Sequence, residues 1–175
     1  SKIIDTDDPG LKDIQLTIEE RPTGEIMAGA GYGTDGSTFS VGIKENNFNG
    51  KGIILESSLN LTEQSIKGSL NYKHPNFKYS ERALSLSLDV TETDKLTDFG
   101  YKSNLNALSV GTSYEQFENT FFSPRFSISS ESLETTSDAS AAYKKQEGSY
   151  FDTSFSYGLN FDKRNSSYQP SSGFI

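Results

Sequence analysis

The sequence predicts an all-β fold, an antiparallel transmembrane β-barrel of which about eight strands are present. Apolar and polar residues alternate over successive segments of about ten residues, the length that a tilted strand needs to cross the hydrocarbon layer. Aromatic residues gather at the ends of these segments, as interfacial girdles do. A short turn, Thr34-Asp35-Gly36, joins the first two segments as in a β-hairpin.

The composition is compatible with strands in a membrane but not with membrane helices. The chain has 175 residues and is only 33% hydrophobic, its mean hydropathy is -0.58, and no run approaches the ~18 apolar residues of a membrane helix. Barrel strands give a weaker signal because their lumen-facing positions are polar. Low hydropathy therefore excludes a helical membrane protein and leaves a barrel possible.

Charge and cysteine content exclude further classes. The net charge of -8 argues against a nucleic-acid partner, because neutralising phosphates needs clustered Lys and Arg. With no cysteine, disulfides and thiolate metal sites are excluded, which suits passage through an oxidising periplasm. No metal or cofactor is expected. No signal-peptide pattern begins at Ser1, so we expect any leader to be removed or to lie upstream.

The first element differs from the rest. Residues 1–23 open with a turn-rich stretch and continue as one short strand, in which Ile14, Leu16 and Ile18 alternate with polar residues. Pro22 ends that strand. We interpret residues 1–23 as the end of a preceding soluble domain with its linker, and residues 24–175 as the barrel part.

Eight strand-like segments follow. They are 24–33, 37–45, 52–61, 65–74, 82–93, 101–114, 121–133 and 150–163. In the fifth, for example, leucines at 84, 86 and 88 alternate with Ser85, Ser87 and Asp89, which places them on opposite faces. The polar stretch 137–148 suits an external loop. A ninth unit begins at Gly173, so this sheet needs the rest of a longer barrel, since an open edge in lipid costs several kcal/mol per unpaired backbone group.

Alternation alone also fits a soluble β-sandwich, because both folds have one apolar and one polar face. Aromatic placement favours the barrel, although the chain contains no Trp. One predicted girdle comprises Phe48, Phe77, Tyr79, Tyr114, Phe117 and Phe121, and the other comprises Tyr32, Phe99, Tyr101, Tyr150 and Phe151. A sandwich would bury such rings in the middle of its strands.

Four motifs in order resemble the BamA family of outer-membrane protein assembly factors, within the surface-antigen barrel superfamily. They are ERPTGE at 20–25, GYGTDG at 31–36, NNFNGKG at 46–52 and DKRN…YQPSSG at 162–173. The resemblance implies that residues 1–23 end the last POTRA repeat. It also implies that residues 24–175 form the first half of a sixteen-stranded barrel, integral to the bacterial outer membrane. The related TamA-like translocation barrels share several of these signals.

The resemblance further implies assembly and insertion of β-barrel proteins rather than enzymatic catalysis. In this family the first strand pairs weakly with the last, and the terminal strand of an unfolded client adds to the exposed first strand. The expected partners are unfolded outer-membrane protein clients, accessory lipoproteins of the assembly complex and outer-membrane lipid. The expected client-strand site comprises Glu25, Ile26, Met27, Ala28, Gly29, Ala30, Gly31 and Tyr32.

The glycines at 24, 29, 31 and 33 fit that role. Glycine weakens pairing inside a strand, allows strands to approach closely and leaves few side chains to lock a seam. Because main-chain hydrogen bonds do not depend on sequence, such an edge can accept many clients. Asp162 and Arg164 form either an ion pair on the lumen side or charges at a strand end, and a structural role is favoured.

Other motifs have structural explanations. The GYGTDG stretch matches the dinucleotide pattern G-x-G-x-x-G, but period-two alternation follows where a helix is required. Asp5, Asp7 and Asp8 resemble part of a calcium loop without its twelfth-position Glu. His74 precedes Pro75 and is expected in a turn. The alternatives left open are a passive pore or adhesin barrel, a TamA-like translocation barrel and a soluble sandwich that binds a partner.

Overall fold

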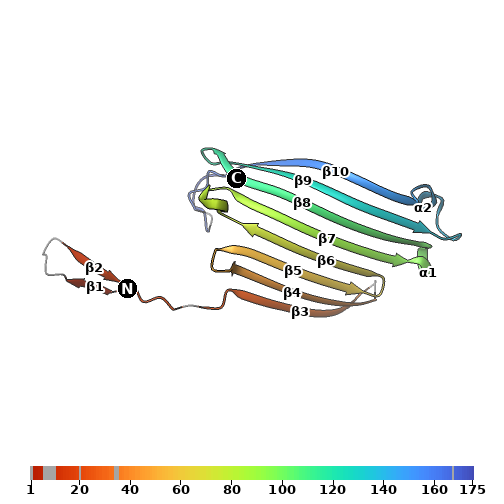
Figure 1. The fold of residues 1–175 in the computed structure, drawn as a ribbon, viewed down its shortest axis with the longest axis horizontal. Helices are drawn as coiled ribbons and strands as arrows, with labels where there is room; N and C mark the ends of the chain where they lie inside the picture. Colours follow the sequence, from red (N-terminus) through yellow and green to blue (C-terminus); the bar gives the residue numbers. More distant parts are fainter. Residues whose placement is uncertain (1, 6–10, 20, 34–35, 167) are drawn as a thin grey trace.

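The computed structural model describes the chain apart from residues 1, 6–10, 20, 34–35 and 167. A two-stranded sheet is followed by one antiparallel sheet of eight strands (Figure 1). The small sheet contains β1 (Lys2–Asp5) and β2 (Lys12–Gln15). The large one contains β3 (Gly24–Gly33), β4 (Gly36–Phe48), β5 (Ile53–Thr62), β6 (Ser65–His74), β7 (Ala83–Lys95), β8 (Tyr101–Phe117), β9 (Thr120–Thr135) and β10 (Gly148–Phe161).

Each strand of the large sheet is hydrogen-bonded to its neighbours in the sequence, so β3 and β10 are the two edges. All eight predicted segments are strands, and the predicted antiparallel barrel-type fold is confirmed. The central strands run further than predicted, because the sequence-based limits followed apolar alternation, whereas backbone pairing continues into polar residues. Asp94, for example, is still paired with Lys102, and the Lys102 Nζ is 3.7 Å from the Asp94 carboxylate.

The register sorts side chains onto an apolar and a polar face. One row across six strands is apolar throughout and joins Leu55, Tyr72, Leu86, Val110, Phe126 and Phe155. Leu86 is 41% exposed and Phe155 is 67% exposed, so no protein layer covers this face within the described residues. The soluble sandwich is therefore wrong for this sheet, since a sandwich buries its apolar face against a second sheet.

On the polar face, short side chains bond across neighbouring strands. Ser58 and Ser69 lie 2.8 Å apart through their hydroxyl oxygens, and so do Ser109 and Ser127. The Arg125 guanidinium donates to the Ser87 hydroxyl at 3.3 Å. These contacts satisfy polar groups between strands, which is the pattern of a polar lumen wall rather than a packed core.

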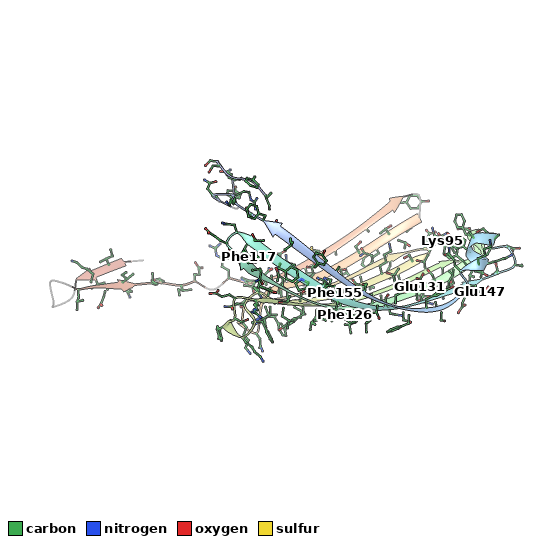
Figure 2. The ribbon with its side chains drawn as sticks, turned by 90° about the horizontal axis from the view of Figure 1, so that it is seen from above. Lys95, Phe117, Phe126, Glu131, Glu147 and Phe155 are labelled. Carbon is green, nitrogen blue, oxygen red and sulfur yellow. The ribbon has the colours of Figure 1, made fainter. Side chains whose placement is uncertain are left out.

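The sheet is twisted and curved, and its two ends differ (Figure 2). We call the end that carries Phe117 the linker end, because the linker from residue 23 enters β3 there, and the opposite end the loop end. The loop end carries α1 (Leu96–Phe99), with Lys95 before it, and α2 (Ala141–Lys145). A 3₁₀ turn, η1 (Phe77–Tyr79), lies in the β6–β7 loop at the linker end. The two predicted aromatic groups fall at these two ends, as expected.

The predicted external loop, 137–148, connects β9 to β10 at the loop end and packs against the connection that contains α1. Tyr143 stacks on Tyr101 with ring centroids 4.2 Å apart. The Thr136 N–H donates to the Gly100 carbonyl at 2.8 Å, and Ala139 is only 6% exposed. The two connections therefore form one small folded cap. Neither α-helix of the described chain is long and apolar enough to cross a membrane.

The N-terminal prediction was partly wrong. A strand occurs near Ile14, but β2 ends at Gln15, before Leu16 and Ile18, and it pairs with β1 inside the stretch predicted as turn-rich. The four residues of β1 were too few for their alternation to be recognised. Ile14 is 67% exposed. Asp7 and Asp8 of the considered calcium loop lie outside the described residues.

Candidate functional site at the first-strand edge

The predicted client-strand residues all lie in β3, at one edge of the large sheet. The register with β4 runs without interruption from Gly24 opposite Glu45 to Gly33 opposite Gly36. Among the described residues, β4 is the only strand that pairs with β3. An antiparallel strand of ten residues with one neighbour leaves about five N–H and five C=O groups unpaired. Those groups form the candidate site.

The side chains of β3 alternate between the two faces. Ile26, Ala28, Ala30 and Tyr32 oppose Ile43, Val41, Phe39 and Ser37 on the apolar face, whereas Glu25, Met27, Gly29 and Gly31 oppose Lys44, Gly42, Ser40 and Thr38 on the polar face. Every residue of β3 is exposed, including Ile26 at 80% and Tyr32 at 85%. The site is thus an uncovered strand edge whose large apolar groups, apart from Met27, lie on one face.

The glycines of β3 leave its polar face bare beyond Met27. An added Cβ at Gly29, Gly31 or Gly33 would meet nothing within 4 Å. On this face the three glycines leave open space beside the strand, and the expectation that they allow close strand approach stays a prediction. Met27 itself lies over Gly42, where an added Cβ would come 3.2 Å from the methionine Cε. Half of the strand thus presents backbone alone on this face.

The start of β3 is tied firmly to the end of β4. The Thr23 hydroxyl donates to the Glu45 carboxylate, which also accepts the Asn47 N–H at 2.7 Å. The Asn46 N–H and Nδ2 both donate to the Thr23 carbonyl, at 3.2 Å and 3.0 Å. We call this group, Thr23 with Glu45, Asn46 and Asn47, the linker clasp. Sequence reasoning missed it, although Thr23 before the first strand and polar residues at 45–47 were a signal.

The G-x-G-x-x-G stretch is a strand-to-strand connection. Gly33 and Gly36 are a paired position of β3 and β4, and Gly36 has φ +82°, which favours glycine. The Ser37 N–H donates to the Glu63 carboxylate at 3.1 Å. Ser37 continues β4, where dinucleotide binding would require a helix N-terminus, so that alternative is excluded. Residues 34–35 of the predicted turn lie outside the described residues.

Asp162 and Arg164 form a two-pronged ion pair directly after β10. The Arg164 Nε donates to Asp162 Oδ1 at 2.8 Å and its Nη2 to Oδ2 at 2.6 Å. These bonds lower the pKa of Asp162 to about 2. The pair lies beside the edge opposite β3, so the structure does not bring the two sets of predicted site residues together. Its assignment to the lumen stays a prediction.

The segment after this pair returns alongside it. The Lys163 N–H donates to the Phe174 carbonyl at 2.9 Å, and the Asn165 N–H donates to the Ser172 carbonyl at 3.1 Å. The Asn165 side-chain oxygen also accepts the N–H groups of Ser171 and Ser172. No strand is assigned to 173–175, so the ninth unit stays a prediction.

The fold and its edge define a class of protein: a large part of an antiparallel β-barrel with a polar and an apolar face, whose first strand has a free edge. The chain belongs to the Omp85 superfamily, because the model of the Omp85 superfamily domain matches residues 47–175. This family is one of outer-membrane β-barrels and is not a family of enzymes. The predicted resemblance is confirmed at this level.

Among solved structures, the chain is similar to BamA from Haemophilus ducreyi lacking POTRA domains 1-3, with 23% identity and a TM-score of 0.63. The match covers 87% of this chain and 32% of that one, so the chain spans about a third of the protein it resembles. At this identity the likeness shows a shared fold.

Proposed function

We propose that the protein assembles and inserts β-barrel proteins into the bacterial outer membrane, and that a client strand adds to the free edge of β3. The observation that carries the proposal is the uncovered backbone of β3, whose polar face has no side chain at 29, 31 and 33. Strand addition at such an edge uses main-chain hydrogen bonds, which many client sequences can form.

In lipid, the free edge of β3 strongly favours pairing with another strand. Each backbone group left unpaired in hydrocarbon costs several kcal/mol, and β3 has about five N–H and five C=O groups on its free side. A partner strand must therefore cover the edge, either from the same barrel or from a client. Because few side chains hold the resting partner strand on β3, a client strand can replace it at this edge.

The linker clasp and the glycines lie at opposite ends of β3, which gives the opening of the seam beside β3 a direction. Thr23 and Glu45 hold the base of β3 on β4 at the linker end, whereas the polar face at 29–33 has no side chain that could hold a neighbour. We infer that the seam opens first at the loop end, while β3 stays attached to its own barrel.

The partners follow from the same proposal. They are unfolded outer-membrane protein clients, accessory lipoproteins of the assembly complex and the membrane lipid around an integral barrel. Residues 1–23 would end the last POTRA domain and residues 24–175 would form the N-terminal half of the barrel. The exposed apolar residues of the small sheet, Ile3 at 68% and Ile14 at 67%, support this division, because they need the rest of a domain to cover them.

Site-specific crosslinking in the full-length protein tests the proposal. The 175 residues contain no cysteine. In a full-length protein from which any other cysteine has been removed, single cysteines at Gly31 in β3, Gly68 in β6 and Ser154 in β10 are therefore distinguishable. A client stalled during insertion, with one cysteine in its terminal strand, is expected to form a disulfide mainly with position 31. Crosslinks only to β10 or to later strands would contradict the β3 site, and a passive pore would give none.

A further inference from the structure

A groove at the linker end has no role in the proposed insertion mechanism. It lies between the β4–β5 turn and the β6–β7 loop, has a volume of about 480 Å³ and is lined by Lys51, Ile53, Tyr72, His74, Lys78 and Tyr79 among others. The KHPNF stretch at 73–77, around the only histidine of the chain, spans the end of β6 and the start of the β6–β7 loop. Its place, charge and unpaired groups together indicate a ligand.

The groove opens on the apolar face of the sheet. Tyr72 pairs with Leu55 and Leu86, and His74 pairs with Leu84, which places all of these side chains on the face that carries the exposed apolar rows. His74, predicted in a turn, is the last residue of β6. The groove is therefore at the border of the apolar band, where aromatic residues of barrels meet lipid headgroups.

The groove is cationic in an acidic chain. Lys51 and Lys78 line it, and no Asp or Glu does, although the chain has a net charge of -8. Neither lysine forms an ion pair with another described residue. The Lys78 ammonium lies over the Phe77 ring, 5.4 Å from its centroid, and no acidic side chain neutralises either lysine in the groove. Two such ammonium groups at a membrane interface attract anionic headgroups.

His74 supplies an independent observation. Its Nδ1 atom is enclosed and has no hydrogen-bond partner among the described residues, although buried polar groups in folded proteins are nearly always paired. The imidazole ring meets Phe77 edge to face, with centroids 5.6 Å apart. Because this atom is enclosed, the ring must turn toward the groove for a phosphate oxygen to pair with it.

The backbone of the β6–β7 loop is held in an uncommon form that presents these groups. Lys78 and Tyr79 have φ values of 53° and 56°, in the left-handed region that non-glycine residues seldom occupy. Asn76 stabilises the loop, because its side-chain oxygen accepts the Glu81 N–H at 3.0 Å. As a result Tyr79 is 94% exposed beside the lysines. Backbone strain of this kind is characteristic of ligand-contacting sites.

We propose that this groove binds the phosphate headgroup of an anionic phospholipid in the leaflet at the linker end; that this is the periplasmic leaflet rests on the proposed function. Lys51 and Lys78 contact the phosphate, Tyr79 lies at the headgroup level, and the acyl chains follow the apolar face beside Ile53 and Tyr72. This site is independent of the client edge at β3, which lies at the margin of the sheet.

The test uses the full-length protein in a neutral detergent, with phosphatidylglycerol, phosphatidylcholine or inorganic phosphate as the probe and bound lipid measured by native mass spectrometry. We expect wild-type protein to retain phosphatidylglycerol over phosphatidylcholine. The double variant Lys51→Gln/Lys78→Gln should retain about tenfold less phosphatidylglycerol, since each basic group near a headgroup contributes appreciably. Lys73→Gln is the matched control, because Lys73 precedes His74 and pairs with Ser85 on the polar face.

Three results would overturn the proposal. They are equal retention of the two lipids by wild-type protein, an equal loss in the Lys73→Gln control, and inorganic phosphate binding as tightly as phosphatidylglycerol. The heat-dependent gel mobility of folded barrels verifies that each variant is folded. His74→Phe gives a second measurement that keeps the lysines, and it should lower phosphatidylglycerol retention without changing that mobility.

Discussion

The strands β3 and β10 are both edges of the same sheet, paired on one side only, yet they carry very different side chains. In β10 large apolar groups project from the apolar face: Phe151, Phe155, Tyr157 and Leu159 are each 67–70% exposed. Tyr157 already meets Phe122 of β9, with ring centroids 6.3 Å apart. In β3 the polar face carries no side chain at 29, 31 and 33, and the apolar face has two alanines.

The difference indicates that the two edges receive different neighbours. Beside β10, residues 172–174 return to the chain that leaves this strand and are bonded to Lys163 and Asn165. The base of β3 is fixed by the linker clasp, and within the described residues no strand pairs with its free side. A bare backbone gives up little side-chain contact when its neighbour changes, which suits an exchangeable seam.

The largest expected effect concerns the turn that follows β10. Gly173 has φ +95°, and an added Cβ would lie 2.0 Å from the Lys163 carbonyl oxygen. Gly173→Ala should therefore destabilise the barrel by about 2 kcal/mol or more, since the backbone must shift as well as leave a glycine conformation. Thermal unfolding in detergent measures this effect, because a folded barrel and a heat-unfolded barrel migrate differently on a gel.

Gly158→Ala in β10 is the matched control, because its added Cβ would meet only the Ser123 Cβ at 4.0 Å. Its stability should remain within about 1 kcal/mol of wild type. If both variants were equally stable, the turn after β10 would not be the fixed connection described above.

A smaller effect, on the rate of client insertion, is expected at the edge of β3. Gly29→Val/Gly31→Val adds β-branched side chains where nothing lies within 4 Å, so β3 should pair more firmly with its resting neighbour. We expect client insertion to slow several-fold while folded stability is unchanged or rises by about 1 kcal/mol. The assay is the rate of client folding into vesicles that contain the full-length protein.

Gly68→Val in β6 is its control, since an added Cβ there also meets nothing within 4 Å but lies between two paired strands. Insertion should proceed at the wild-type rate. A slowdown of the same size in this variant would mean that glycine content in general, rather than the β3 edge, sets the rate.

The smallest effect concerns the ion pair beside β10. Arg164 holds the pKa of Asp162 at about 2, below its usual value of 3.8, so the carboxylate stabilises the fold above about pH 4 and loses this contribution as pH falls toward 2. Asp162→Asn should be slightly less stable than wild type at neutral pH, because ion pairs near the surface contribute little even when partly buried. The difference should vanish near pH 2. If the stability difference between the variant and wild type persisted near pH 2, it would come from the introduced amide rather than from the lost charge.

Much of the fold was predictable because lipid on one face and polar groups on the other impose period-two alternation, which is visible in segments such as 84–90. The short strand β1 was missed because four residues carry too little alternation. The extensions of β7, β8 and β9 were missed because polar residues pair through their backbones as well as apolar ones do.

The candidate site was predictable in part. The glycine-rich strand 24–33 was recognised, but the open space beside Gly29 and Gly31 was not predictable, since it depends on what the neighbouring strand places there. The linker clasp and the groove at His74 join residues more than 20 positions apart, such as Thr23 with Glu45 and Lys51 with Lys78. Such contacts follow from strand register, which the sequence alone does not supply.

The strictly sequential strand order has a consequence for how such a barrel is made. Since every strand from β4 to β9 pairs with the two strands adjacent to it in the chain, the sheet can grow hairpin by hairpin, with short loop closures that cost little entropy. None of these steps pairs the backbone groups on the free side of β3. The first strand of the large sheet therefore keeps an open edge while the seven strands after it are added.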